Sequence, residues 1–335
     1  MLDIHQSLIR EVYKGILGRE PDAEGLEYYA GQLVNGKALY EILFEIQQSP
    51  ENLDRQRTSL GLHSLAVFIH VCRTGGTSLH EMLMSSFSDR VFTEHGDSLA
   101  TKSIEELQYF SVLAGHFNFE SVKALPLFRP LIFTFVRNPS ERLVSQYNFW
   151  RAHLPSAPSW HRGMELAHDL EMDAFWNHEE IAASNDHWNH MTWAVMGNSV
   201  WSEWKDIFSR PFDLKTRTAL LDNMVRLSVR RRLKEFVFVG ITEQYDESCR
   251  RLSLAMNWPS FSDIHHIHGV KQLSHEHPDF LKTHQSLKPT PNAIKVLKRL
   301  TELDQIVYEE ALTLFHISNN EFQSVVEEEQ NENSI

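Results

Sequence analysis

A change of hydrophobic period across two adjacent glycines determines the local fold of the segment FIHVCRTGGTSLHEML, residues 68–83. Residues 65–71 are apolar at nearly every position, which is typical of a strand buried on both faces. After the glycines, Leu79, Met82 and Leu83 recur at helical spacing. The segment therefore predicts a buried strand, a glycine-rich turn and a helix in direct succession.

The predicted turn is suited to binding an anion. The first amide N–H groups of a helix have no partner within the helix, and the helix dipole adds positive potential at that end. Arg73 adds a full charge in the same place. The alternative is an ordinary turn in which the glycines give backbone freedom and Thr77 or Ser78 caps the helix. The pattern G-x-x-x-x-G-K-[ST] is not matched, because no lysine follows Gly76, and a Mg-nucleotide hydrolase is therefore disfavoured.

The composition excludes several function classes. The chain has 335 residues, of which 42% are hydrophobic, and this is enough for one large core and a smaller unit. Its formal net charge of -13 argues against non-specific binding of nucleic acid. No apolar run approaches the roughly 20 residues that cross a bilayer, and the N-terminus lacks a signal-peptide pattern. Cys72 and Cys249 provide no disulfide framework, so we expect a cytoplasmic protein.

Residues 1–58 are predicted to form a separate helical unit, divided by turn signals at Pro21-Asp22 and Asn35-Gly36. Its three apolar stripes at helical spacing comprise Leu8, Val12, Tyr13, Ile16 and Leu17; Leu26, Tyr29 and Leu33; and Leu39, Ile42, Leu43 and Ile46. The stretch VYKGILGREPDAEGLEYYAGQLVNG resembles a small helical domain of unknown function that recurs in bacterial proteins, often beside glycan-modifying enzymes. We expect a docking or spacer module that recruits a protein partner. At the other end, residues 321–335 are acidic and are predicted to form a flexible tail.

Between these ends strands and helices alternate, which predicts an α/β fold with a mainly parallel central sheet. In the stretch LIFTFVRNPSERLVSQYNFW, residues 131–136 form a second buried strand. Asn138 then begins a helix, with Pro139 at its first position and Glu141 placed to close a capping box.

This second unit places two more polar side chains near the turn of the first. Arg137 lies at the carboxyl end of the predicted strand, and Ser145 lies about two turns into the helix that follows. Ligands of open α/β sheets bind at the carboxyl ends of the strands. The two strand-turn-helix units are therefore expected to hold opposite ends of one phosphorylated ligand.

Both stretches resemble motifs of the sulfotransferases. HVCRTGGTSL resembles the loop that binds the 5'-phosphosulfate, and FVRNPSERLVSQYNFW is similar to the 3'-phosphate motif, with Arg137 and Ser145 at the family's spacing. A third stretch, FVFVGITEQYDES at residues 236–248, resembles the strand and turn that follow in the group of uronyl 2-O-sulfotransferases and their bacterial relatives. The resemblance implies a P-loop-like nucleotide-binding fold over residues 62–320, flanked by helices.

The resemblance also implies the donor, 3'-phosphoadenosine 5'-phosphosulfate (PAPS), with the 3',5'-bisphosphate (PAP) as product and no metal. Arg137 and Ser145 would hold the 3'-phosphate. The 5'-phosphosulfate would be held by the loop residues Arg73, Thr74, Gly75, Gly76, Thr77 and Ser78. The family commonly has Pro-Lys where this chain has Cys72 and Arg73, and arginine keeps the charge but changes its geometry. Arg73 is the candidate for stabilising charge on the leaving phosphate.

The general base for the acceptor hydroxyl is predicted to be His116, in LAGHFNFE. The preceding apolar residues deliver it where a strand would end, and a Gly-His-Phe element at this interval resembles the catalytic histidine of the 2-O-sulfotransferase group. Histidine titrates near neutral pH and is the usual general base. The alternative is a hydrogen-bonded structural histidine, in which case Glu94 or His95 would act as the base.

The acceptor is expected to be a glycan or another hydroxyl-bearing molecule. Seven of the eight tryptophans lie between Trp150 and Trp204, in a segment rich in histidine and asparagine. Their rings could stack on sugars or simply pack in a core. Residues 185–197, NDHWNHMTWAVMG, occupy the position of an acceptor-side segment in the family.

Two charged or histidine-rich segments have alternative interpretations. The basic run RLSVRRRLKE, residues 226–235, could guide an anionic acceptor, although a solvated helix face with paired charges is commoner. Residues 263–277 contain five histidines but lack the cysteine pair or helical spacing of a metal site. A loop over the donor site that carries Lys271 is the favoured interpretation.

Two other functions fit parts of this pattern. A non-catalytic nucleotide- or glycan-binding protein would keep the phosphate loops but would not need His116, and Arg73 would then mark lost chemistry. A phosphotransferase would need the P-loop lysine and Mg ligands, which the sequence does not supply.

Overall fold

The computed structural model describes residues 2–47, 49, 51–52, 65–94, 96, 99–125, 130–182, 184, 187–261, 278–282 and 285–332. The chain divides into two compact units. The first comprises Met1–Leu65 with Pro126–Pro130, and the second comprises Ala66–Leu125 with Leu131–Ile335. The predicted residues His95 and Lys271 and the histidine-rich stretch 263–277 lie outside the described residues.

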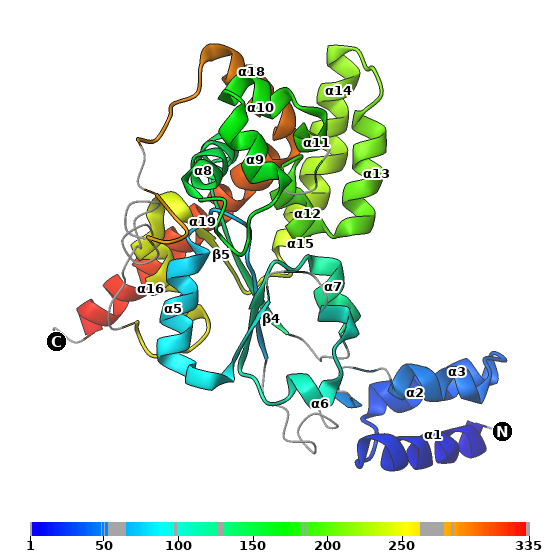
Figure 1. Cartoon of the computed structure of the whole chain (residues 1–335). Helices are drawn as coiled ribbons and strands as arrows, with labels where there is room; N and C mark the ends of the chain where they lie inside the picture. Colours follow the sequence, from blue (N-terminus) through cyan, green and yellow to red (C-terminus); the bar gives the residue numbers. More distant parts are fainter. Residues whose placement is uncertain are drawn as a thin grey trace. The chain divides into compact units, whose positions relative to one another are not determined.

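In the described part of the first unit, the long helices are α1 (Leu2–Leu17), α2 (Ala23–Val34) and α3 (Leu39–Gln47), drawn in blue in Figure 1. They enclose a core of their own, formed by Ile9, Val12, Tyr13, Leu17, Leu26, Ala30, Ile42 and Ile46. Val12, Tyr13 and Leu17 of the predicted stripe on the first helix are buried, but Leu8 is 36% exposed and Ile9 is buried in its place.

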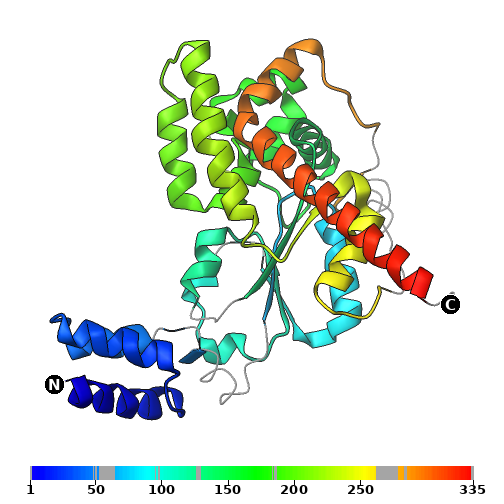
Figure 2. The same ribbon diagram turned by 180° about the vertical axis from the view of Figure 1, so that it is seen from behind.

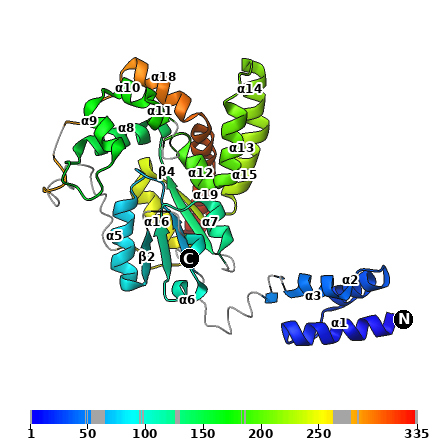
Figure 3. The ribbon, with the colours of Figure 1, turned by 45° about the vertical axis from the view of Figure 1, so that its right-hand side comes forward.

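The second unit is built on a five-stranded sheet in the order β2-β3-β1-β4-β5, and every neighbouring pair is parallel. Its strands are β1 (Ala66–Ile69), β2 (Val91–Glu94), β3 (Val112–Gly115), β4 (Leu131–Val136) and β5 (Phe238–Ile241). The sheet runs through the middle of this unit, and the edge strand β2 can be followed in Figure 3. The predicted α/β class with a parallel sheet is confirmed.

Helices cover the sheet, and two of them share a core with it. Helix α5 (Gly76–Phe87) supplies Leu79 and Leu83, and α16 (Tyr245–Ala255) supplies Leu252, all fully buried. They pack with the central strands, where the rings of Phe68 and Phe133 stack with centroids 5.2 Å apart. These strands are buried on both faces, which explains why their sequences are apolar without alternation.

A second group of helices lies beyond the carboxyl ends of the strands, at the top of Figure 1. Its core joins residues of α8 (Pro139–Ala152), α9 (Arg162–Asp169), α10 (Met172–Asn177) and α18 (Pro291–Leu300). The other helices of this unit are α6 (Ile104–Leu107), α7 (Phe119–Ala124), α11 (Glu179–Ala182), α12 (His190–Met196), α13 (Asn198–Phe208), α14 (Leu214–Leu220), a π-helical turn (Leu221–Arg226), α15 (Leu227–Leu233) and α19 (Glu302–Glu332).

Helix α19 crosses the back of this unit in Figure 2 and is continuous through Glu332. The sequence predicted a flexible tail from residue 321, whereas the structure extends the helix over most of that acidic segment. Helix α19 also pairs with the basic run: Glu310 accepts hydrogen bonds from Arg226 at 3.0 Å and from Arg230 at 2.8 Å. This run is therefore a paired helix face, as the commoner interpretation predicted. Within the described part of the chain, no helix is both long and apolar enough to cross a membrane.

Candidate active site

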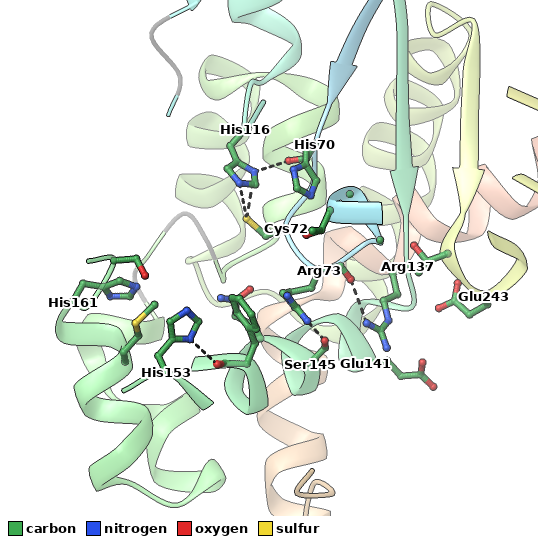
Figure 4. A pocket seen from close by; sticks show the side chains of 18 residues that line it. His70, Cys72, Arg73, His116, Arg137, Glu141, Ser145, His153, His161 and Glu243 are labelled. Carbon is green, nitrogen blue, oxygen red and sulfur yellow. Dashed lines mark hydrogen bonds between the residues drawn. The ribbon is translucent and has the colours of Figure 1, made fainter. Parts of the chain in front are cut away.

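A cavity of about 870 Å³ lies at the carboxyl ends of the strands, in the second unit. Figure 4 shows side chains from four strand ends and from α8 converging on it. Its lining comprises His70, Cys72, Arg73, Gly75, Gly76, Thr77, His116, Arg137, Glu141, Ser145, Gln146, Phe149, His153, Ser159, His161, Met164, Thr242 and Glu243. The structure thus brings together seven of the predicted site residues: Arg73, Gly75, Gly76, Thr77, His116, Arg137 and Ser145.

The glycine-rich turn ends in a helix start without a side-chain cap. Helix α5 begins at Gly76, and its N-cap is Gly75, with φ of +83° in the left-handed region. The alternative in which Thr77 or Ser78 caps this helix is therefore wrong. Because Gly75 has no side chain to cap them, the first amides of α5 leave the partial positive charge of a helix N-terminus beside the cavity.

Two predicted hydroxyls of the turn are used inside the protein. Thr74 is fully buried, and its Oγ1 donates to the carbonyl oxygen of Val71 at 2.8 Å. Ser78 is 3% exposed and its side chain hydrogen-bonds that of Tyr245. Neither residue lines the cavity, whereas Thr77 does. Of Thr74, Thr77 and Ser78, only Thr77 therefore lines the cavity.

Both glycines of the turn are required by close packing. A Cβ on Gly76 would lie 1.9 Å from Nε2 of His70, and one on Gly75 would lie 2.6 Å from the ring of Tyr245. These distances are far below van der Waals contact. The turn thus fits between an imidazole and a phenol ring, and no larger residue is accommodated at either position.

The third predicted motif holds the turn from the side of β5. The hydroxyl of Tyr245 donates to the carbonyl oxygen of Gly75 at 3.0 Å. The hydroxyl of Thr242 lies 3.0 Å from the carbonyl oxygen of Thr74 and 2.9 Å from that of Val136. Burial raises the pKa of Tyr245, so its hydroxyl remains a donor. These contacts tie the turn to β4 and β5.

Arg73 extends along the cavity wall toward α8. Its Nε donates to Oγ of Ser145 at 3.2 Å, and its guanidinium lies 4.1 Å from the ring centroid of Phe149. Its backbone is in the left-handed region, with φ of +67°, and its carbonyl oxygen accepts from Arg137 at 3.3 Å. The sequence assigned Arg73 and Ser145 to opposite ends of the donor, whereas here they contact each other.

The charge on Arg73 is destabilised by its surroundings. Burial, and then repulsion from Arg137, lowers the pKa of Arg73 to about 10, so that it is still charged at pH 7. An anion placed between two such arginines would offset both effects. Since each arginine follows a different strand, the parallel sheet brings the two charges together.

His116 follows β3 and lies above the turn in Figure 4. Its Nδ1 lies 2.8 Å from the carbonyl oxygen of His70, and the two imidazole rings stack with centroids 4.5 Å apart. The thiol of Cys72 lies 3.5 Å from the same nitrogen. A carbonyl oxygen can only accept, so Nδ1 carries the hydrogen and Nε2 keeps a lone pair in the neutral ring. Glu94, the alternative base, ends β2 and does not line the cavity.

Helix α8 borders the cavity along its length. Its N-cap is Asn138, whose side chain accepts from the amide of Glu141 at 3.1 Å, as predicted. The predicted return bond from Glu141 is wrong, because the amide of Asn138 donates to Glu243 instead, at 2.7 Å. The carboxylate of Glu243, which follows β5, thus accepts the hydrogen bond from the N-cap amide of this helix.

Four cavity residues on α8 and at its C-cap lie at intervals of four: Glu141, Ser145, Phe149 and His153. This spacing puts them on one helix face. Of this stripe the sequence predicts only Ser145 as a site residue, and it also places Cys72 in the loop. It does not predict the other lining residues, which are His70, Gln146, Ser159, His161, Met164, Thr242 and Glu243. The four-residue period from Ser145 was a usable signal for Phe149 and His153.

The predicted acceptor-side residues have structural roles. None of the seven tryptophans between Trp150 and Trp204 lines the cavity, and four are buried, including Trp176 at 0% exposure. In the segment 185–197, Oδ1 of Asn189 accepts from the amides of Leu303 at 2.8 Å and Asp304 at 3.0 Å. The amide of Thr192 donates to Asp304 at 2.7 Å. The polar groups of this segment therefore secure the start of α19.

Comparisons with known proteins agree with the motifs. Residues 63–309 match the model of a family described as "Sulfotransferase family", and residues 4–56 match a "Domain of unknown function (DUF4214)". No curated protein matches the chain.

Proposed function

Because the chain belongs to the sulfotransferase family, we propose that it transfers the sulfuryl group of PAPS to a hydroxyl of a carbohydrate acceptor and releases PAP. The observation that carries this proposal is the convergence of two arginines, an uncapped helix start and His116 on one cavity. We further propose that residues 62–320 form a P-loop-like catalytic domain of the 2-O-sulfotransferase type, as in bacterial relatives, and act in the cytoplasm.

The cavity residues suit the two anionic ends of PAPS. The amides at the start of α5, with Arg73 and the Thr77 hydroxyl, would hold the 5'-phosphosulfate. Thr74, Gly75, Gly76 and Ser78 would contribute through the backbone. Arg137 and Ser145 would hold the 3'-phosphate. The lowered pKa of Arg73 supports its place beside the 5'-phosphosulfate, because burial without an anion disfavours the charge of Arg73.

In the proposed reaction a hydroxyl oxygen of the acceptor attacks sulfur in line with the leaving phosphate. The new bond joins the acceptor oxygen to sulfur, and the bond between sulfur and the bridging oxygen breaks. The electron pair of that bond stays on the phosphate oxygen, where Arg73 would stabilise the charge. Nε2 of His116 takes the hydroxyl proton, because its Nδ1 hydrogen is directed at the His70 carbonyl oxygen. The scheme uses no metal.

The first test follows the label from radioactive PAPS into a panel of glycan acceptors, with wild type, His116→Ala and the exposed-site control His316→Ala. We expect His116→Ala to lower the rate by roughly 100- to 10,000-fold, with PAP affinity nearly unchanged, since a base acts on the acceptor proton. His316→Ala should behave as wild type. Full activity in His116→Ala would remove it as the base.

The second test concerns the 3'-phosphate. Wild type should bind PAP more tightly than AMP, because Arg137 and Ser145 form a dedicated site, and Arg137→Ala should abolish this preference. Losing a charge-assisted hydrogen bond costs about 1.5–3 kcal/mol, or roughly 10- to 100-fold in affinity. Calorimetry with both nucleotides measures the ratio. Equal affinity of wild type for PAP and AMP would contradict the assignment.

A non-catalytic binding protein is the second candidate, favoured by one observation. Arg73 stands where the family commonly has lysine, and its side chain is directed at Ser145 and Phe149. Such a protein would bind PAP with the same preference over AMP but transfer no label to any hydroxyl acceptor. The two tests together therefore separate the candidates.

A further inference from the structure

We propose that His153 binds a second hydroxyl of the acceptor, so that the acceptor is a sugar-like molecule with several hydroxyls, one of which is sulfated while another is recognised. This inference rests on the proposed function and names the acceptor class of the same cavity. It depends on the position of His153 along α8, on its orientation and on the residues around it.

The spacing of residues along helix α8 gives distances along the cavity. Ser145 and His153 both line it and are eight residues apart, which corresponds to about 12 Å along a helix axis. Arg137, with Ser145, marks the end proposed for the 3'-phosphate. In Figure 4, His153 lies on the opposite side of Arg73 from Arg137, on the same side as His116. His153 is therefore at the end of the cavity where an acceptor would enter.

The orientation of His153 is fixed by its own helix. Nδ1 lies 2.9 Å from the carbonyl oxygen of Phe149 and must donate to it, which leaves the lone pair on Nε2. The backbone carbonyl oxygen of His153 accepts from Nε2 of His168 at 3.0 Å. The side chain is buried except for 7% and borders the cavity. An imidazole held in this way is a preorganised acceptor for a hydroxyl.

The charge state of His153 supports a role as hydrogen-bond acceptor. Burial, with smaller contributions from His161, Arg73 and His168, lowers the pKa of His153. The ring is therefore neutral near pH 7, and a neutral ring with Nδ1 protonated can accept at Nε2.

The neighbouring wall fits a sugar-like ligand. Phe149 provides an aromatic face and Met164 an apolar contact, and Ser159 and His161 add polar groups. His161 is held by the amide of Gly163, which donates to its Nδ1 at 3.0 Å, and by an edge contact with Trp150. The carboxylates in the described lining, Glu141 and Glu243, adjoin Asn138 at the start of α8. Apolar surface with a few oriented polar groups is the usual composition of a carbohydrate site.

The experiment measures acceptor binding to the PAP-loaded protein by calorimetry, so it does not depend on turnover. The probes are neutral 4-nitrophenyl hexopyranosides, their singly deoxygenated analogues and 4-nitrophenyl β-D-glucuronide. The proteins are wild type, His153→Phe and the control His316→Phe, which changes an exposed histidine on α19 that does not line the cavity.

We expect at least one neutral glycoside to bind wild type and to bind His153→Phe roughly 5- to 100-fold more weakly, the range for a lost hydrogen bond to a buried group. His316→Phe should lose much less. The analogue that lacks the recognised hydroxyl should bind wild type as weakly as the parent glycoside binds His153→Phe. That analogue should bind wild type and His153→Phe with equal affinity.

Three results would overturn the proposal: no glycoside binds, His153→Phe binds as wild type, or the two variants lose affinity equally. The same criteria apply to the glucuronide, which also carries several hydroxyls. PAP binding and label transfer to any other hydroxyl acceptor are measured separately, so failure here is distinguishable from failure of the proposed function.

Discussion

Arg73 combines a strained backbone with a desolvated charge. A left-handed conformation in a residue other than glycine costs of the order of 1 kcal/mol, and burial lowers the pKa of the side chain to about 10. Arg73 is held in this conformation by the hydrogen bond that its carbonyl oxygen accepts from Arg137 and by the one that its guanidinium group donates to Ser145. Strain of this kind clusters at functional sites, which supports the role proposed for this residue.

The exchange Arg73→Lys tests whether these contacts matter. Lysine keeps the charge but lacks the planar group that stacks on Phe149 while bonding Ser145, so we expect PAP affinity to fall by roughly 5- to 30-fold, equivalent to about 1–2 kcal/mol. Calorimetry measures the affinity, and Arg210→Lys at an exposed position is the control. Retained or increased affinity and rate would show that arginine merely substitutes for the family's lysine.

At the scale of elements, the turn before α5 is held by residues far along the chain. Tyr245→Phe removes one hydroxyl and leaves the ring against Gly75. The carbonyl oxygen of Gly75 then loses this donor and keeps the amide of Leu79, at 3.2 Å, while the packing remains. We expect a loss of about 1 kcal/mol in the free energy of unfolding and a several-fold weaker affinity for PAP.

The matched control for that exchange is Tyr109→Phe. The hydroxyl of Tyr109 also donates a hydrogen bond, at 2.6 Å to Asp89, but this residue is 56% exposed. Urea unfolding and PAP calorimetry should leave the Tyr109 variant within about 0.5 kcal/mol of wild type. If both variants match wild type in PAP affinity, the bond to Gly75 does not position the turn.

Elements with continuous apolar character were predictable from sequence. The strand at residues 131–136 has the predicted bounds, because its apolar run ends at Arg137 and Pro139 fixes the next helix start. The contact of Arg73 with Ser145 was not predictable, because it depends on the side-chain direction of two residues on different elements. The tryptophans were misleading for a physical reason: the helices beyond the strands need a core of their own, and large rings fill it.

At the scale of the whole molecule, each unit has its own core. The apolar core described for the first unit lies on α1, α2 and α3, and all the residues that line the cavity belong to the second unit. We therefore predict that removing residues 1–58 leaves a folded chain with unchanged PAP affinity. Circular dichroism, thermal unfolding and calorimetry on full-length and shortened proteins measure this. Aggregation, or loss of PAP binding in a folded product, would show that the first unit contributes to the site.

The hydrogen bonds around the turn also impose an order on protein synthesis. His116 contacts a partner 46 residues earlier, Arg137 one 64 residues earlier, and Tyr245 one 170 residues earlier. A nascent chain therefore exposes the turn before α5 long before the residues that hold it have been translated. Because domains fold as units and long-range contacts form late, we expect the growing chain to acquire the proposed PAP binding only after α16 has left the ribosome. A partial product released earlier would carry both motifs without a formed cavity.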